Sequence, residues 1–157
     1  MRSNRQQTAV PPTAAILNND SPTLTERTFT LPKEERLKSR TLIDTLFDGG
    51  KSRAMTAFPL RMVYMVKDRI DLEPQTQVLV SVPKRCFKRA VKRNRVKRQV
   101  RDAYRHHKLT VVGALKAHEH FDRTVVMAFI WLDNKLHSSA DVEAKVSGLL
   151  TRLSEKI

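Results

Sequence analysis

The segment Lys84–Lys108 constrains the fold most, because it is both strongly cationic and amphipathic. Its 25 positions hold 12 of the chain's 30 lysine and arginine residues and a single acid, Asp102. Its apolar residues follow a helical spacing and share one face: Val96, Val100, Ala103 and Tyr104. A helix with one apolar face buries that face against another element. The spacing therefore predicts a long helix over Phe87–His107 that packs on a core.

The other side of this helix carries the cations. At about 100° per residue, one face groups these side chains: Asn94, Arg95, Lys97, Arg98, Arg101 and Arg105. Like charges four residues apart cost about 0.2–0.5 kcal/mol per pair, whereas solvated helices normally mix signs at this spacing. A cost without local compensation is typical of a functional site. Because lysine and arginine neutralise phosphates, the face indicates nucleic-acid binding, and its charge alone does not say which nucleic acid.

The composition narrows the class of partner. A chain with 30 basic and 16 acidic residues has a formal charge of +14, which favours polyanionic partners. No apolar run approaches the roughly 20 residues that span a bilayer, and no signal-peptide pattern follows Met1, so we expect a cytoplasmic protein with no membrane partner. Cys86 is the single cysteine, which excludes an internal disulfide and a cysteine-based zinc site.

The whole chain divides into a polar N-terminal segment and one domain. Residues 1–28 are rich in Ser, Thr, Asn, Gln and Pro without periodicity, so we expect a disordered N-terminal extension followed by a folded domain over 29–157. The expected elements are a helix over Arg40–Phe47 capped by Ser39, strands over Phe58–Val66, Val78–Val82 and Arg123–Leu132, a loop or short helix over Leu109–Phe121, and a last helix capped by Ser138 or Ser139. This order predicts an α/β sandwich in which helices pack on one small sheet.

The basic segment also resembles a family signature. The bacterial ribonuclease P protein subunit carries an Arg-Asn-Arg motif, an apolar residue, Lys-Arg, and an Arg-acid-x-aromatic-Arg ending. The counterparts here are Arg93-Asn94-Arg95, Val96, Lys97-Arg98 and Arg101-Asp102-Ala103-Tyr104-Arg105. Leu31–Arg40, the stretch from Ile43 to Gly50, and Val78–Val82 before Lys84-Arg85 extend the likeness to about residues 29–155.

The resemblance implies a fold and an activity. The implied fold is an α+β two-layer sandwich like ribosomal protein S5 domain 2, with a small mixed four-stranded sheet, three helices and a left-handed βαβ crossover. The implied activity is that of the accessory protein in an endoribonuclease that removes the 5′ leader from precursor tRNA. The partners would be the catalytic RNA, in a 1:1 holoenzyme, and the precursor leader. The catalytic groups and the magnesium would belong to the RNA, with no catalytic residue, cofactor or metal held by the protein.

The resemblance also assigns roles to residues. The expected RNA-binding residues are Lys84, Arg85, Arg89, Arg93, Asn94, Arg95, Lys97, Arg98, Arg101 and Arg105. The single-stranded leader would lie in a cleft between the sheet and the first helix, lined by Ile43, Phe47, Arg61 and Val63. Ile43 stands where the family pattern has an aromatic residue, so this end of the cleft would offer apolar contact without base stacking.

Two other functions use the same basic helix. A ribosomal or assembly protein would bind RNA without assisting cleavage, and a DNA-binding regulator would lay the helix in the major groove and discriminate bases. His106-His107 and His118-Glu119-His120 do not predict a metal site, because histidines two residues apart do not share a helix face. Trp131 lies in an apolar strand and is expected in the core.

Overall fold

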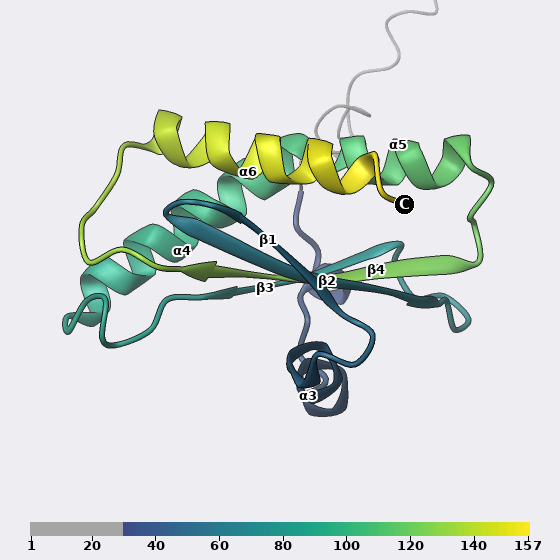
Figure 1. The fold of residues 1–157 in the computed structure, drawn as a ribbon, viewed down its shortest axis with the longest axis horizontal. Coiled ribbons are helices and arrows are strands. Elements are labelled where there is room, and N and C mark those ends of the chain that lie inside the picture. The colour runs from purple at the N-terminus through teal and green to yellow at the C-terminus, as the bar shows by residue number, and fades with distance from the viewer. Residues whose placement is uncertain (1–29) are drawn as a thin grey trace, which may run out of the picture. The chain divides into compact units, whose positions relative to one another are not determined.

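The computed structural model describes residues 30–157, and the expectations for residues 1–28 and for Phe29 lie outside this range. Figure 1 shows a four-stranded sheet in the order β1-β2-β4-β3 with helices above and below it. The elements are the 3-10 turn η2 (Lys33–Glu35), α3 (Arg40–Asp48), β1 (Arg53–Ala57), β2 (Leu60–Asp68), β3 (Thr76–Ser81), α4 (Ala90–His107), α5 (Leu109–Ala117), β4 (Arg123–Trp131) and α6 (Ser139–Ser154).

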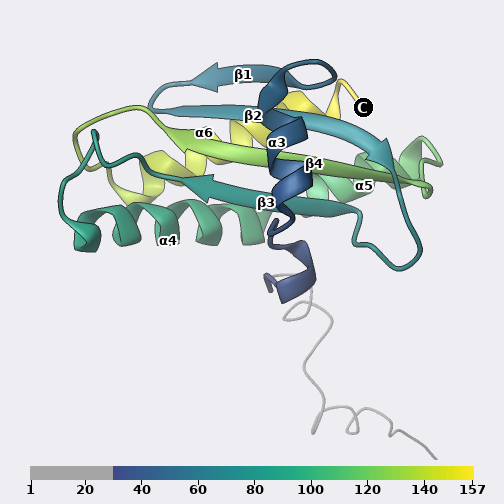
Figure 2. The ribbon, with the colours of Figure 1, turned by 90° about the horizontal axis from the view of Figure 1, so that it is seen from below.

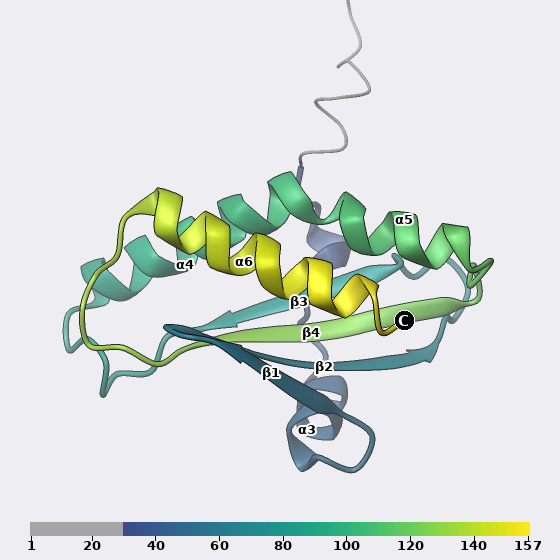
Figure 3. The ribbon, with the colours of Figure 1, turned by 45° about the horizontal axis from the view of Figure 1, so that its top comes forward.

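The sheet is mixed, as expected. β1 with β2 and β2 with β4 are antiparallel, whereas β3 and β4 are parallel. Parallel neighbours need a crossover connection, and here α4 and α5 provide it. In Figure 2, β3 and β4 point the same way, and Figure 3 shows α4 and α5 on one face of the sheet, so the connection is the expected left-handed crossover.

Helices cover the two faces of the sheet unequally. Figure 3 shows α4, α5 and α6 together on one face, and in Figure 2 α3 alone crosses the strands of the other face. The larger core contains the α4 stripe, the α6 residues and Trp131, which is fully buried as expected. The smaller core lies under α3 and is formed by Leu37, Leu46, Val63, Met65, Val126 and Ala128. A single short helix leaves part of the second face open.

Several element boundaries differ from the sequence expectations. The strand expected over Phe58–Val66 begins two residues later, because Phe58 and Pro59 form the turn that joins it to β1. The strand β1 (Arg53–Ala57) was not anticipated, since five residues with one buried side chain give a weak signal. The long helix begins at Ala90 rather than Phe87, which lies buried in the preceding loop. The segment left open as a loop or short helix forms α5.

A buried ion pair ties the segment before α3 to the end of α4. The Lys108 ammonium contacts both carboxylate oxygens of Glu35 at 3.0 Å, and only 6% and 15% of these side chains are exposed. Beside the pair, the Tyr104 hydroxyl donates to Thr76 Oγ1 at 2.7 Å. Burial, followed by the nearby Glu35 carboxylate, raises the pKa of Tyr104 above its usual value. The cluster fixes the N-terminal segment against α4 and β3.

Glu35→Gln should destabilise the fold because it leaves the Lys108 ammonium buried without its counter-charge. The expected loss is about 2–4 kcal/mol in the free energy of unfolding. Urea unfolding followed by circular dichroism measures it. Glu34→Gln is the matched control, since Glu34 is exposed and should change stability by less than about 0.5 kcal/mol. Equal stability of the two variants would contradict the structural role of the pair.

Candidate nucleic-acid interface

The helix α4 presents its cations to solvent because its apolar stripe is buried. Val96, Val100 and Tyr104 are fully buried, and Ala103 is 3% exposed, as expected from the spacing. The exposed side of α4 is called the cationic ridge and consists of Asn94, Arg95, Lys97, Arg98, Arg101 and Arg105. Of these, Lys97 and Arg105 are half-buried and the others are exposed. The structure therefore brings the predicted ridge residues together on one surface.

Most cations of the ridge have no acidic partner within the described residues. Arg105 contacts Asp102 at 3.0 Å, and both side chains of this pair are partly exposed, so its energetic value is small. Within residues 30–157, the side chains of Arg95, Lys97, Arg98 and Arg101 make no ion pair or hydrogen bond. Their guanidinium and ammonium donors face water, so they are available to an anionic ligand.

The helix dipole adds to the charge at the start of α4. No acid occupies the first turn, and the N-cap Arg89 provides no side-chain cap. Exposed amides of a first turn carry partial positive charge, which normally favours acidic side chains there. Here Lys84, Arg85 and Arg89 precede the helix and are exposed. The combination produces a strong positive potential of the kind that attracts phosphate.

Arg93 has a different role from its neighbours in the motif. Its Nη1 donates to the carbonyl oxygens of Phe87 at 2.8 Å and Lys88 at 2.7 Å. These bonds hold the loop that precedes α4 against the first turn of the helix. Arg93 is half-buried and partly committed to the fold, whereas Asn94 and Arg95 are exposed. Sequence spacing could not reveal this, because the two carbonyl acceptors lie in an irregular loop.

A hollow lies on the opposite face of the sheet, beside α3. It is lined by Leu46, Phe47, Gly49, Ser52, Arg53, Ala54, Arg61, Val63 and Ile130. Arg61 and Val63 alternate with core residues on β2, so both face α3. Phe47 is 46% exposed, so much of its side chain is accessible from the hollow. The predicted residues Phe47, Arg61 and Val63 therefore meet in one hollow.

Ile43, the fourth predicted residue of the cleft, does not line this hollow. It is half-buried and packs on the smaller core together with Leu79 and Ile130. The hollow instead includes Ser52, Arg53 and Ala54, which sequence reasoning missed together with β1. Arg53 is exposed but alternates with Ala54 on β1 and shares the face of Met55, so its side chain projects towards the larger core side, where it also lines a hollow with Lys156 and Ile157.

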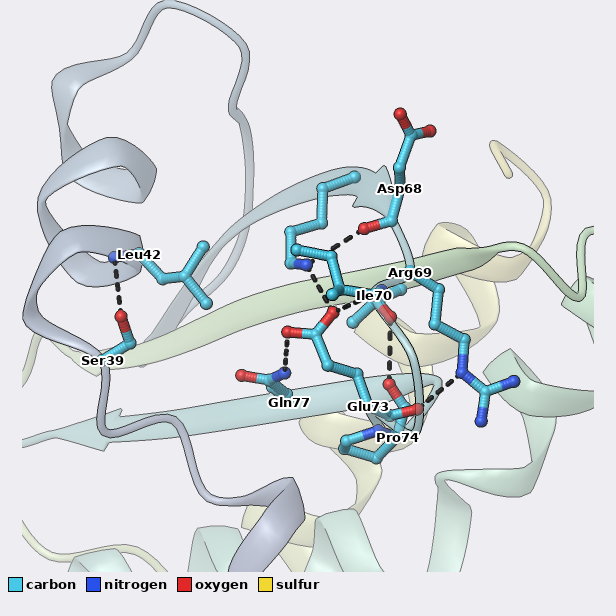
Figure 4. A network of polar contacts seen from close by, with 10 residues as sticks. Ser39, Leu42, Asp68, Arg69, Ile70, Glu73, Pro74 and Gln77 are labelled. Carbon is cyan, nitrogen blue, oxygen red and sulfur yellow. Dashed lines mark hydrogen bonds and ion pairs between the residues drawn. The ribbon is translucent and has the colours of Figure 1, made fainter.

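A polar network occupies the loop between β2 and β3 (Figure 4). The Lys67 ammonium contacts Glu73 Oε2 at 2.6 Å, and the Ile70 amide donates to the same oxygen at 3.0 Å. Burial raises the pKa of the Glu73 carboxyl, but the Lys67 ammonium and the Ile70 amide outweigh this effect, and the net pKa lies below its usual value. Lys67 follows Val63 and Met65 on the strand and shares their face. This ion pair offsets positive charge at that end of the sheet, whereas Arg53 and Arg61 keep theirs.

Two structural features bear on other classes of ligand. Among residues 30–157, no group of three or more His, Cys, Asp or Glu side chains is placed to hold a metal ion. In the same part of the chain, no helix has the length and apolar character required to span a membrane.

Comparisons with known proteins agree on one family. Residues 31–153 match the family described as Ribonuclease P. The chain is 38% identical over 130 residues to the ribonuclease P protein component of Porphyromonas gingivalis, covering 83% of this chain and 90% of that protein. It is 33% identical over 109 residues to the component of Chlorobaculum tepidum, covering 68% and 70%.

Solved structures show the same fold. The ribonuclease P protein of Thermotoga maritima matches with a TM-score of 0.56 at 17% identity, over 75% of this chain and 96% of that one. The Staphylococcus aureus protein matches with a TM-score of 0.52 at 15% identity, over 76% and 94%. At these identities the likeness establishes the arrangement of helices and strands.

Arg93→Ala should lower stability because two loop carbonyls lose their donor. The expected loss is about 1–2 kcal/mol in the free energy of unfolding. Thermal or urea unfolding of the free protein measures this loss without any RNA. Lys92→Ala is the matched control, since Lys92 is exposed in the same turn and should change stability little. If Arg93→Ala is as stable as Lys92→Ala, the structural role of Arg93 is wrong.

Proposed function

Since this chain belongs to the ribonuclease P protein family, we propose that it is the protein subunit of the RNA-based endoribonuclease that removes the 5′ leader from precursor tRNA. It binds the catalytic RNA through the cationic ridge and the single-stranded leader in the hollow beside α3. The holoenzyme contains one protein and one catalytic RNA and acts in the cytoplasm. The RNA supplies the catalytic groups and binds the magnesium ions.

The unpaired cations of the ridge are the observation that carries this proposal. Each lysine or arginine that contacts a phosphate releases condensed counterions, which favours binding at low salt. Arginine offers a planar fork that bridges phosphate oxygens or stacks on a base. Asn94 adds a neutral donor and acceptor that can reach a base edge or a ribose hydroxyl. Because the helix is already ordered by its buried stripe, little entropy is lost when these groups bind.

The hollow beside α3 suits a single strand rather than a duplex. Phe47 presents an aromatic face for an unstacked base, and stacking of this kind contributes about 1–3 kcal/mol. Arg61 stands beside it as a donor for a phosphate of the same strand. Ile43 lies outside the hollow, so a second stacked base on α3 is not part of the proposal. The protein thus has two surfaces with separate roles.

Arg95→Ala should weaken binding to the catalytic RNA. The variant removes one exposed cation from the ridge. The slope of log affinity against log salt should therefore flatten by about the amount that one phosphate contact contributes. Filter binding over a salt series measures the slope. Arg123→Ala is the matched control, because Arg123 is also exposed but lies at the start of β4. Equal slopes for Arg95→Ala and the control would contradict the role of the ridge.

Phe47→Leu should reduce the preference of the holoenzyme for precursors that carry a leader. Leucine keeps the apolar contact but loses the stacking face, so affinity for the precursor should fall about 5- to 100-fold while affinity for mature tRNA stays unchanged. Phe121→Leu replaces an exposed aromatic residue outside the hollow and should have no effect. If Phe47→Leu and Arg95→Ala both weaken binding to the catalytic RNA and both reduce the preference for leader-bearing precursors, the two surfaces do not have separate roles.

A further inference from the structure

The segment that precedes α3 runs beside the edge strand β3. The Leu37 amide donates to the Val78 carbonyl at 2.9 Å, and Arg36 forms a parallel bridge with Val78. The ion pair of Glu35 with Lys108 anchors the segment one residue earlier. Residues 35–37 are therefore held by backbone and side chain, so the flanking side chains project from a fixed position.

Two cations of this segment face α4 across a groove. Leu37 is buried in the smaller core, whereas its neighbours Arg36 and Lys38 are exposed. Residues two apart on an extended chain project to the same side, about 6.6 Å from each other. The groove has a volume of about 240 Å³ and is lined by Leu31, Arg36, Leu37, Lys38, Val78, Leu79, Val80 and Arg101. Basic side chains thus stand on two sides of a largely apolar floor.

The three cations of the groove are available to a ligand. Arg36, Lys38 and Arg101 are all exposed. None of their side chains makes an ion pair or a hydrogen bond within residues 30–157. Three unpaired cations around one groove repel each other in the free protein, and a bound anion removes this cost.

The groove borders the cationic ridge and the smaller core. Arg101 belongs to the cationic ridge on α4. Leu79 lines the groove and Ile130 lines the hollow beside α3, and both pack against the smaller core. A strand that leaves the hollow along this core can reach the ridge across the β3 edge at Arg36 and Lys38.

We propose that Arg36 and Lys38 form a phosphate-binding site for the precursor leader, at the point where the strand passes from the hollow to the ridge. The proposal rests on the proposed function and adds a third contact region to it. The small volume fits one strand, whereas a duplex cannot enter. Two cations on extended backbone can each neutralise one phosphate of that strand.

The test compares the wild-type holoenzyme with one that carries Arg36→Ala and Lys38→Ala together. Affinity for a precursor with a long leader should fall about tenfold or more. Its salt slope should flatten by about 1.4, since each phosphate of a single strand contributes about 0.7. Affinity for mature tRNA, and of the protein for the catalytic RNA, should stay unchanged. Lys33→Ala is the control, because Lys33 is exposed in the same segment but does not line the groove.

The remaining outcomes of this experiment lead to different conclusions. Unchanged affinity for the long leader, or an equal loss for mature tRNA, overturns the leader site. A loss confined to the affinity of the protein for the catalytic RNA assigns the groove to that RNA and also overturns the proposal. If the wild-type holoenzyme itself does not prefer leader-bearing precursors, the proposed function fails instead. Arg36→Lys with Lys38→Arg keeps both charges and should retain wild-type affinity.

Discussion

The burial of one side of α4 determines where the charge of this protein lies. Val96, Val100, Ala103 and Tyr104 pack in the larger core, and each large apolar side chain contributes about 1.5–3 kcal/mol when buried. Repulsion between like charges along the opposite side amounts to a few tenths of a kcal/mol per pair. Burial therefore outweighs repulsion, and the helix holds its cations at fixed positions facing solvent. A flexible basic tail with the same charge would lose more entropy on binding RNA.

The sheet places the ridge and the hollow on different sides of the domain. Helices α4, α5 and α6 occupy one face, so the other face is left to the short helix α3 and to a hollow beside it. At the β3 edge, the Glu35–Lys108 pair fixes the segment that leads into α3, and this segment shares a groove with Arg101 of the ridge. In the proposed function, this arrangement lets one small domain bind a structured RNA and a single strand at the same time.

Sequence reasoning captured the parts of the fold with strong periodicity. The stripes of α4 and α6 and the apolar run of β4 predict their own burial, because each pattern matches one element type. It missed β1 and placed the start of β2 too early, since a five-residue edge strand and a turn at Pro59 leave little local signal. The resemblance to a family, and not periodicity, indicated four strands.

Side-chain roles set by tertiary contacts were harder to predict. Arg93 belongs to the same motif as Arg95, but its hydrogen bonds to two loop carbonyls form only in the folded protein and cannot be predicted from the motif. Arg36 and Lys38 lie more than sixty residues from Arg101 in sequence, and nothing in their local pattern places them across one groove. Ile43 and Phe47 lie one turn apart on α3, yet only Phe47 lines the hollow.

The most direct test of the account is cleavage of precursor tRNA by the catalytic RNA at low magnesium, with and without this protein. The magnesium ions and the cations of the protein both neutralise RNA phosphates, so the protein should matter most when magnesium is scarce. The account predicts a large gain in cleavage rate when the protein is added, and a smaller gain as magnesium rises. If adding the protein leaves the cleavage rate at low magnesium unchanged, whether or not the protein binds the catalytic RNA, the proposed function is contradicted.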